Sequence, residues 1–146
     1  MIRKISQLFQ KLNPEPLETS SESQHQAIAG LLCEVSHADS VADLDEHQAK
    51  VSLLQKITEI SESESIALIE KGSQQLKDAV SLFEYTTQLR AMDPEQRFEL
   101  IQGLWEVAYA DGTVDPQEEA IIRQVAELLY VDHSEYIRAK LLVVPH

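Results

Sequence analysis

The stretch that decides the fold covers residues 106–119 and reads EVAYADGTVDPQEE. Its first part ends a helical pattern, and the pair Asp111-Gly112 indicates a tight turn. Asp115-Pro116 then opens the next helix, because Asp as a cap and Pro in the first turn are typical of helix starts. Four carboxylates fall within nine residues of this unit: Asp111, Asp115, Glu118 and Glu119. The stretch therefore predicts two helices joined by an acidic turn.

A second, weaker copy lies 72 positions earlier and reads EVSHADSVADLDE, residues 34–46. Pairing position i with i+72 gives seven identities over positions 32–46, four of them acidic. The acidic matches are Glu34 with Glu106, Asp39 with Asp111, Asp43 with Asp115, and Glu46 with Glu118. Two such units predict a fold with two pseudo-symmetric helix-turn-helix halves.

Composition points to one all-α domain. The chain has 146 residues, 43% of them apolar, with only four Gly and five Pro. No segment alternates in the manner of a strand, so we expect a single-domain bundle of about seven to eight helices. The only cysteine, Cys33, excludes an internal disulfide and fits a buried thiol.

The expected organisation has three parts: an amphipathic helix at 1–12, an acidic Pro/Ser-rich linker at 13–23 and a helical domain at 24–146. The apolar periodicity of the domain predicts helices near 24–38, 44–60, 61–76, 78–91, 93–111, 116–130 and from 132 onward. In the segment 78–91, Phe83 and Leu89 are expected on the buried face, and Gly72 is a candidate break before it.

The formal charge of −13 excludes nucleic acid as a natural partner and favours cations or basic proteins. Residues 1–12 are the exception, with Arg3, Lys4 and Lys11 and no acid. That helix either docks on the core or binds a membrane surface or a membrane-associated partner. No apolar run is long enough to cross a bilayer, and the basic N-terminus lacks a signal-peptide core, so a cytoplasmic protein is expected.

The acidic turns have two interpretations. Asp115 and Asp43 suit helix caps, and Glu118 and Glu46 suit the return half of a capping box. Asp111 and Asp39 do not, because each lies where a helix already ends with partial negative charge. Their compensation is either a bond to the turn's own N–H groups or a bound cation.

A hard divalent cation such as Ca²⁺ or Mg²⁺ prefers carboxylate and carbonyl oxygens. The candidate ligands are Asp111, Asp115, Glu118, Glu119, Asp39, Asp43 and Glu46. The spacing is too short for an EF-hand loop. No catalytic or phosphate-binding motif is present, so no enzyme is expected, and a carboxylate-based hydrolase ranks last.

The run LWEVAYADG at 104–112, followed by Asp115, Glu118 and Glu119, resembles the TerB-like family of tellurite-resistance proteins. The run from Asp132 to Lys140 is also similar to that family. The resemblance implies an all-helical fold with two related halves, a link to tellurite and other chemical stress, and a divalent-metal site at the acidic residues. The first copy departs from the pattern, since Ser40 stands where Gly112 stands in the second.

These observations favour a non-enzymatic protein that binds a divalent cation through its acidic turns. The alternative is a metal-independent protein–protein interaction module with an acidic surface.

Overall fold

The computed structural model describes residues 21–36, 44–75 and 81–145. Within these ranges the chain is all-α and contains no strand, which confirms the predicted fold class. The helices are α2 (Ser21–Val35), α3 (Leu44–Thr58), α4 (Glu62–Gln75), α5 (Leu82–Thr87), α6 (Pro94–Ala108), α7 (Pro116–Leu128) and α8 (His133–Val143). None of these helices is both long and apolar enough to cross a lipid bilayer.

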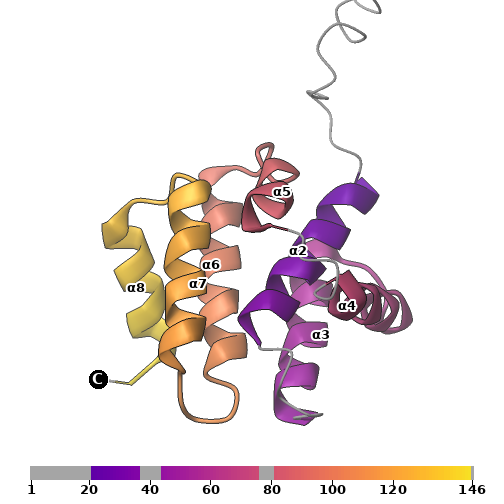
Figure 1. Ribbon diagram of the computed structural model, residues 1–146, viewed down its shortest axis with the longest axis horizontal. Coiled ribbons are helices and arrows are strands. Elements are labelled where there is room, and N and C mark those ends of the chain that lie inside the picture. Colours follow the sequence, from indigo (N-terminus) through magenta and orange to yellow (C-terminus); the bar gives the residue numbers. More distant parts are fainter. Residues whose placement is uncertain (1–20, 37–43, 76–80, 146) are drawn as a thin grey trace, which may run out of the picture.

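The helices fall into two similar trios, with α5 between them in sequence (Figure 1). Helices α2, α3 and α4 begin at residues 21, 44 and 62, and adding the repeat spacing of 72 gives 93, 116 and 134. Helices α6, α7 and α8 begin within one residue of these positions, at 94, 116 and 133. The packing follows the same order, because α2 contacts α4 most extensively and α6 contacts α8 most extensively. Helices α2 and α3 both pack against α6 and so join the trios.

Three of the predicted helix starts, those of α4, α6 and α7, are confirmed by side-chain caps. Asp93 Oδ1 accepts a bond from Gln96 N at 2.8 Å, and Gln96 Oε1 accepts one from Asp93 N at 3.0 Å. Asp115 and Glu118 form the same capping box at the start of α7. Ser61 Oγ accepts from Glu64 N at 3.2 Å at the start of α4. These caps satisfy backbone donors that the first helical turn leaves unpaired.

The start of α2 differs from the predicted one. Ser21, Glu22 and Ser23 belong to α2, although they were expected in the linker. A glutamate in the first turn suits the positive end of the helix dipole, so acidic composition alone did not exclude a helix here. The predicted helix at residues 2–12 lies outside the described residues.

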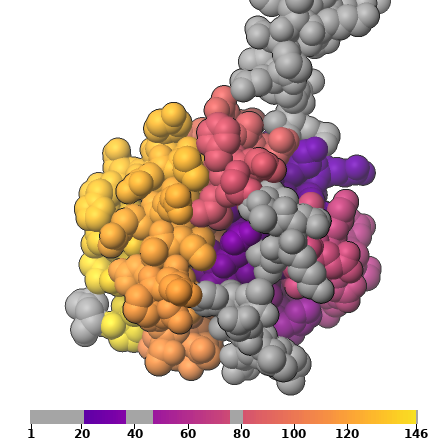
Figure 2. All heavy atoms as spheres, viewed as in Figure 1, coloured from indigo at the N-terminus to yellow at the C-terminus, as the bar shows by residue number. Residues whose placement is uncertain are grey.

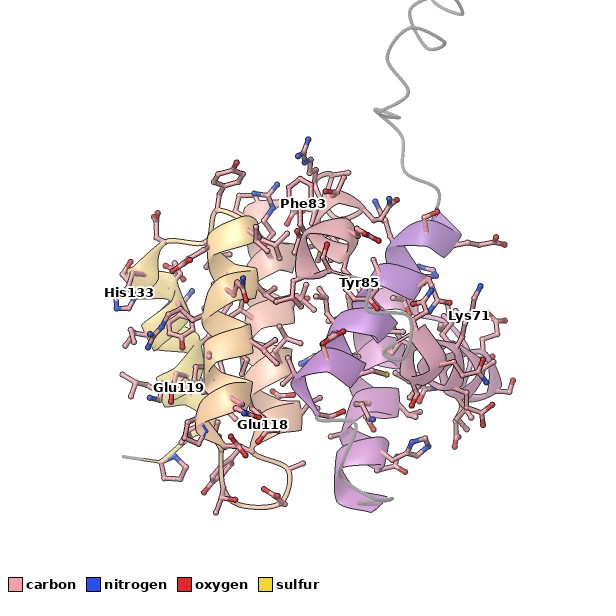
Figure 3. All side chains as sticks on the ribbon, in the orientation of Figure 1. Lys71, Phe83, Tyr85, Glu118, Glu119 and His133 are labelled. Atoms are coloured by element: carbon pink, nitrogen blue, oxygen red, sulfur yellow. The ribbon has the colours of Figure 1, made fainter. Side chains whose placement is uncertain are left out.

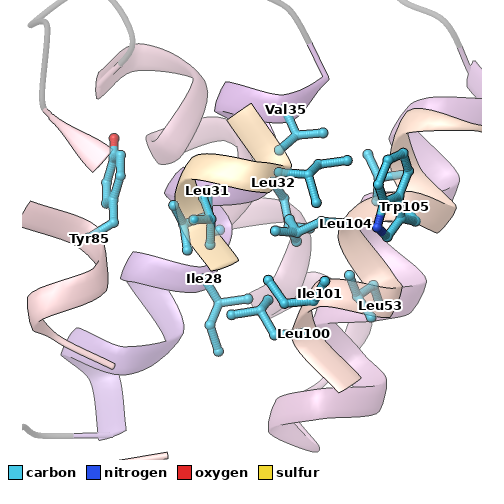
Figure 4. Close-up of a cluster of buried hydrophobic side chains, with 14 of the residues drawn as sticks. Ile28, Leu31, Leu32, Val35, Leu53, Tyr85, Leu100, Ile101, Leu104 and Trp105 are labelled. Atoms are coloured by element: carbon cyan, nitrogen blue, oxygen red, sulfur yellow. The ribbon is translucent and has the colours of Figure 1, made fainter. Parts of the chain in front are cut away.

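The core runs between the trios, where α2 and α6 supply most of the buried side chains (Figure 4). Leu31 and Leu32 of α2 and Leu104 and Trp105 of α6 are fully buried. The Trp105 ring also packs on Tyr136 of α8, with 5.5 Å between ring centroids. The spacing of apolar residues had predicted Leu104 and Trp105 inward, as expected for the core-facing stripe of an amphipathic helix.

Helix α5 corrects the prediction for residues 78–91. It spans only Leu82–Thr87, with Ser81 as its cap, and a turn follows. Phe83 was expected inside but is 57% exposed, whereas Tyr85 is buried. A helix of six residues has too few turns for apolar spacing to define its inner face, so packing against α2 decides it.

Close helix packing depends on glycines, among them Gly30 of α2 and Gly72 of α4. Gly72 was a candidate break, yet α4 continues through it. A Cβ at Gly72 would lie 3.1 Å from the carbonyl oxygen of Ala29 in α2. A Cβ at Gly30 of α2 would overlap the ring of Tyr85. Both glycines therefore allow a neighbour to approach a helix backbone directly.

Gly30→Ala is expected to lower the free energy of unfolding by about 1–3 kcal/mol, because the rigid Tyr85 ring must move. This loss exceeds the gain of about 1 kcal/mol that alanine gives over glycine in a helix interior. Urea unfolding followed by circular dichroism measures it. Gly72→Ala is the matched control, with a smaller loss, since its Cβ makes only a tight contact. A Gly30→Ala protein as stable as wild type would contradict the packing of Tyr85 on α2.

Asp115→Ala is expected to destabilise the protein by about 0.5–2 kcal/mol, because the capping bonds at the start of α7 are lost. Asp115→Asn should retain most of the stability, since its amide oxygen also accepts those bonds. Asp132→Ala is the control: Asp132 is the cap residue of α8 but makes no side-chain capping bond within the described residues. Equal losses for Asp115→Ala and Asp132→Ala in thermal unfolding would exclude this role of Asp115.

Candidate functional site

The acidic turn between α6 and α7 is fully described and has a defined backbone geometry. Helix α6 ends at Ala108, and the N–H of Gly112 donates to the carbonyl of Tyr109 at 2.8 Å. Gly112 has φ +93°, which is the left-handed conformation expected for it. A Cβ there would meet nothing within 4 Å, so backbone conformation rather than space favours glycine.

Asp111 is exposed and is compensated within its own turn. Its Oδ1 accepts bonds from Thr113 N at 3.1 Å and from Thr113 Oγ1 at 3.4 Å. The first bond joins a side chain to the backbone two residues on, as in an Asx turn. The sequence left two explanations open for Asp111, a bond to the N–H groups of its own turn or a bound cation. The structure shows the bond within the turn.

Asp115 and Glu118 have structural roles at the start of α7. Asp115 Oδ1 accepts from Gln117 N at 2.7 Å, and Glu118 Oε1 accepts from Asp115 N at 3.0 Å. Asp115 is exposed, but Glu118 is only 5% exposed. Burial of an acid this close to the helix N-terminus is offset by the backbone donors and by the positive end of the helix dipole.

Glu119 forms an ion pair with a different helix. Its Oε1 lies 3.2 Å from Nζ of Lys140, so the pair joins α7 to α8. Lys140 Nζ also lies 5.4 Å from the centroid of the Trp105 ring. Adjacent helical residues point about 100° apart, and Figure 3 shows Glu119 beside α8 while Glu118 lies near the turn. Glu118 therefore contributes to the start of α7, whereas Glu119 contributes to the contact between α7 and α8.

The first acidic turn cannot be compared in the same detail. Asp39 and Asp43 lie outside the described residues, and so does the side chain of Glu46, although its backbone belongs to α3. The described ends of α2 and α3 lie at the same end of the bundle as the α6–α7 turn, the lower end in Figure 1.

Metal binding at the predicted ligands remains a prediction. In the part of the chain that the structure describes, no three or more His, Cys, Asp or Glu side chains are grouped so as to hold a metal ion. Asp111, Asp115, Glu118 and Glu119 come together in one turn but do not converge on one point. Their arrangement presents negative charge and hydrogen-bond acceptors to cationic groups.

Two features of this region were not predicted from the sequence: the role of Lys140 and the burial of Glu118. Lys140 follows Glu119 by 21 positions, and no local pattern links them. Its spacing of four from the buried Tyr136 would have placed it on the inner side of α8. Burial of Glu118 was equally unexpected, because a capping glutamate is normally solvated.

Comparison with known proteins assigns the chain to a protein family. The chain matches no curated protein and no solved structure. Residues 25–141 match the family described as tellurite resistance protein TerB, and this match covers α2 to α8 almost entirely. It includes both acidic turns and extends over most of the chain. The protein therefore belongs to the TerB family, as the residues of its second acidic turn had suggested.

Proposed function

We propose that this protein is a non-enzymatic TerB-family component of the response to tellurite and related chemical stress, and that it binds a basic protein partner through its acidic turn. The family description supports the link to tellurite. The net charge of −13 supports attraction of a basic partner. Exposed Asp111 and Asp115 at the α6–α7 turn are the residues proposed to meet it.

The observation that carries this proposal is the local bonding of the four carboxylates. Asp111 and Asp115 accept bonds from backbone N–H groups of their own turn, Glu118 completes a capping box, and Glu119 pairs with Lys140. A Ca²⁺ ion at this turn would need about 6–8 oxygens and would have to draw several of these groups away. A lysine or arginine side chain can instead form ion pairs with the exposed carboxylates, which the turn already orients.

A divalent cation held jointly by the two acidic turns is the second candidate. It is favoured by the repeated Asp-x-x-x-Asp-x-x-Glu spacing. The described end of α2 and the start of α3 also lie at the same end of the bundle as the α6–α7 turn. Its ligands would be Asp111, Asp115, Glu118 and Glu119 together with Asp39, Asp43 and Glu46. Ca²⁺ and Mg²⁺ are the ions whose oxygen preference fits this set.

The double substitution Asp111→Asn/Asp115→Asn tests the partner proposal. Asparagine retains an oxygen that accepts the turn and cap bonds, so the fold should persist while two negative charges are lost. A lysine-rich synthetic peptide serves as the basic probe, with affinity measured by calorimetry at low salt. We expect binding to weaken by roughly three- to tenfold, because exposed ion pairs contribute about 0.2–1 kcal/mol each.

The matched control is Glu95→Gln/Glu127→Gln, which removes the same charge from exposed positions at the opposite ends of α6 and α7. This protein should bind the peptide nearly as well as wild type. Equal weakening in both double variants would assign binding to net charge alone and would refute recognition at the turn.

The cation proposal has its own test: titration of the wild-type protein with Ca²⁺, Mg²⁺, Mn²⁺ and Zn²⁺, repeated on Asp111→Asn/Glu118→Gln. Binding heat and a raised melting temperature in wild type, both lost in the variant, would support a metal site. If no ion gives heat or a thermal shift, the metal site is excluded and the partner proposal is unaffected.

A further inference from the structure

A groove of about 710 Å³ lies between α2, α4 and α5, away from the acidic turn. Tyr85 of α5 and Lys71 of α4, both labelled in Figure 3, are among its lining residues. Ala27, Ala67 and Leu68 give it an apolar floor. Its volume is in the range of about 300–1,000 Å³ that is typical of ligand sites.

Polar atoms in this groove lack partners. The Tyr85 hydroxyl, Gln26 Oε1 and Gln75 Oε1 are buried and have no hydrogen-bond partner among the described residues. Tyr85 is only 4% exposed, and Figure 4 shows it at the edge of the hydrophobic cluster. Burial raises the pKa of Tyr85 to about 12, so the hydroxyl keeps its proton at neutral pH. A buried polar atom without a partner costs about 1–3 kcal/mol, which an occupant carrying hydrogen-bond donors would recover.

Charge defines the chemistry of that occupant. Glu22, Glu64 and Glu84 line the groove, against Lys71 and His25. The groove is therefore acidic, and the two glutamine oxygens are acceptors. A segment with basic side chains on one side and apolar side chains on the other meets both the carboxylates and the apolar floor.

The N-terminal segment of the same chain has this composition. Ile2, Ile5, Leu8, Phe9 and Leu12 recur at helical spacing, and Arg3, Lys4 and Lys11 carry the only charges of residues 2–12. The described chain begins at Ser21, next to the groove residue Glu22. Residues 13–20 can extend over about 26–29 Å at most, which brings the segment within reach of the whole groove.

We propose that residues 2–12 dock as an amphipathic helix in the groove between α2, α4 and α5. The apolar stripe lies on Ala27, Ala67 and Leu68, and the basic side chains pair with Glu22, Glu64 and Glu84. This inference concerns a surface separate from the acidic turn and does not depend on the proposed function.

The test places a spin label on the full chain through Gln10→Cys, a polar position of the segment. Cys33 will not react, because it is buried and burial raises the pKa of its thiol. Paramagnetic broadening of backbone amide signals is then measured by NMR. We expect strong broadening in α4 and α5, including Leu68 and Tyr85, and none at the exposed Gln124 of α7 or Leu142 of α8.

Charge exchange tests the proposed pairing. Arg3→Glu/Lys4→Glu should abolish the broadening in α4 and α5, and adding Glu64→Lys/Glu84→Lys should restore it. Adding Glu95→Lys/Glu127→Lys instead, on exposed positions far from the groove, should not restore it. Restoration by both pairs would show attraction by net charge alone and would overturn the pairing.

Mixing isotope-labelled chain without a spin label and spin-labelled chain without isotope identifies the source of the segment. Absence of broadening in this mixture supports docking within one chain. Broadening in the mixture would show that a second copy fills the groove, and no broadening of α4 and α5 in the singly labelled chain would show that residues 2–12 do not bind there. Either result overturns the proposal.

Discussion

Burial of helix α2 on nearly every side is the constraint on which the described structure depends. Eight of its fifteen residues are buried, and it packs against α3, α4, α5, α6 and α7. On the face drawn in Figure 2, α2 surfaces at its N-terminal end and in a small area between the two trios. A helix surrounded in this way needs small residues where neighbours come closest. Gly30 receives the Tyr85 ring, and Gly72 of α4 lies against the Ala29 carbonyl.

The same packing separates the acidic turn from the groove. The acidic turn lies beyond the C-terminal end of α6, where local hydrogen bonds orient Asp111, Asp115 and Glu118. The groove lies where α2, α4 and α5 meet, and polar atoms of Tyr85, Gln26 and Gln75 have no hydrogen-bond partner there among the described residues. One surface is therefore set by turn chemistry and the other by how helices of different lengths meet.

Sequence reasoning succeeded where short-range chemistry decides structure. Asp93 with Gln96, Ser61 with Glu64, and Asp115 with Glu118 all mark helix starts, because each bond spans only three residues. Gly112 adopts positive φ for an equally local reason. The burial of Leu104 and Trp105 in α6 also agrees with apolar spacing, since this helix is long enough for a stripe to be recognised.

The sequence did not predict the features that depend on contacts between residues far apart in the chain. Phe83 and Tyr85 are separated by one residue and are both aromatic, yet only packing of Tyr85 onto Gly30 determines which is buried. The pairing of Glu119 with Lys140 spans 21 positions, and it exists because α7 and α8 pack together. The sequence alone determined the helical class, the capped starts of α4, α6 and α7 and the acidic turn, because these depend on bonds between near neighbours. The tertiary structure decided which acids are buried or paired and where a groove forms, because those depend on which helices meet.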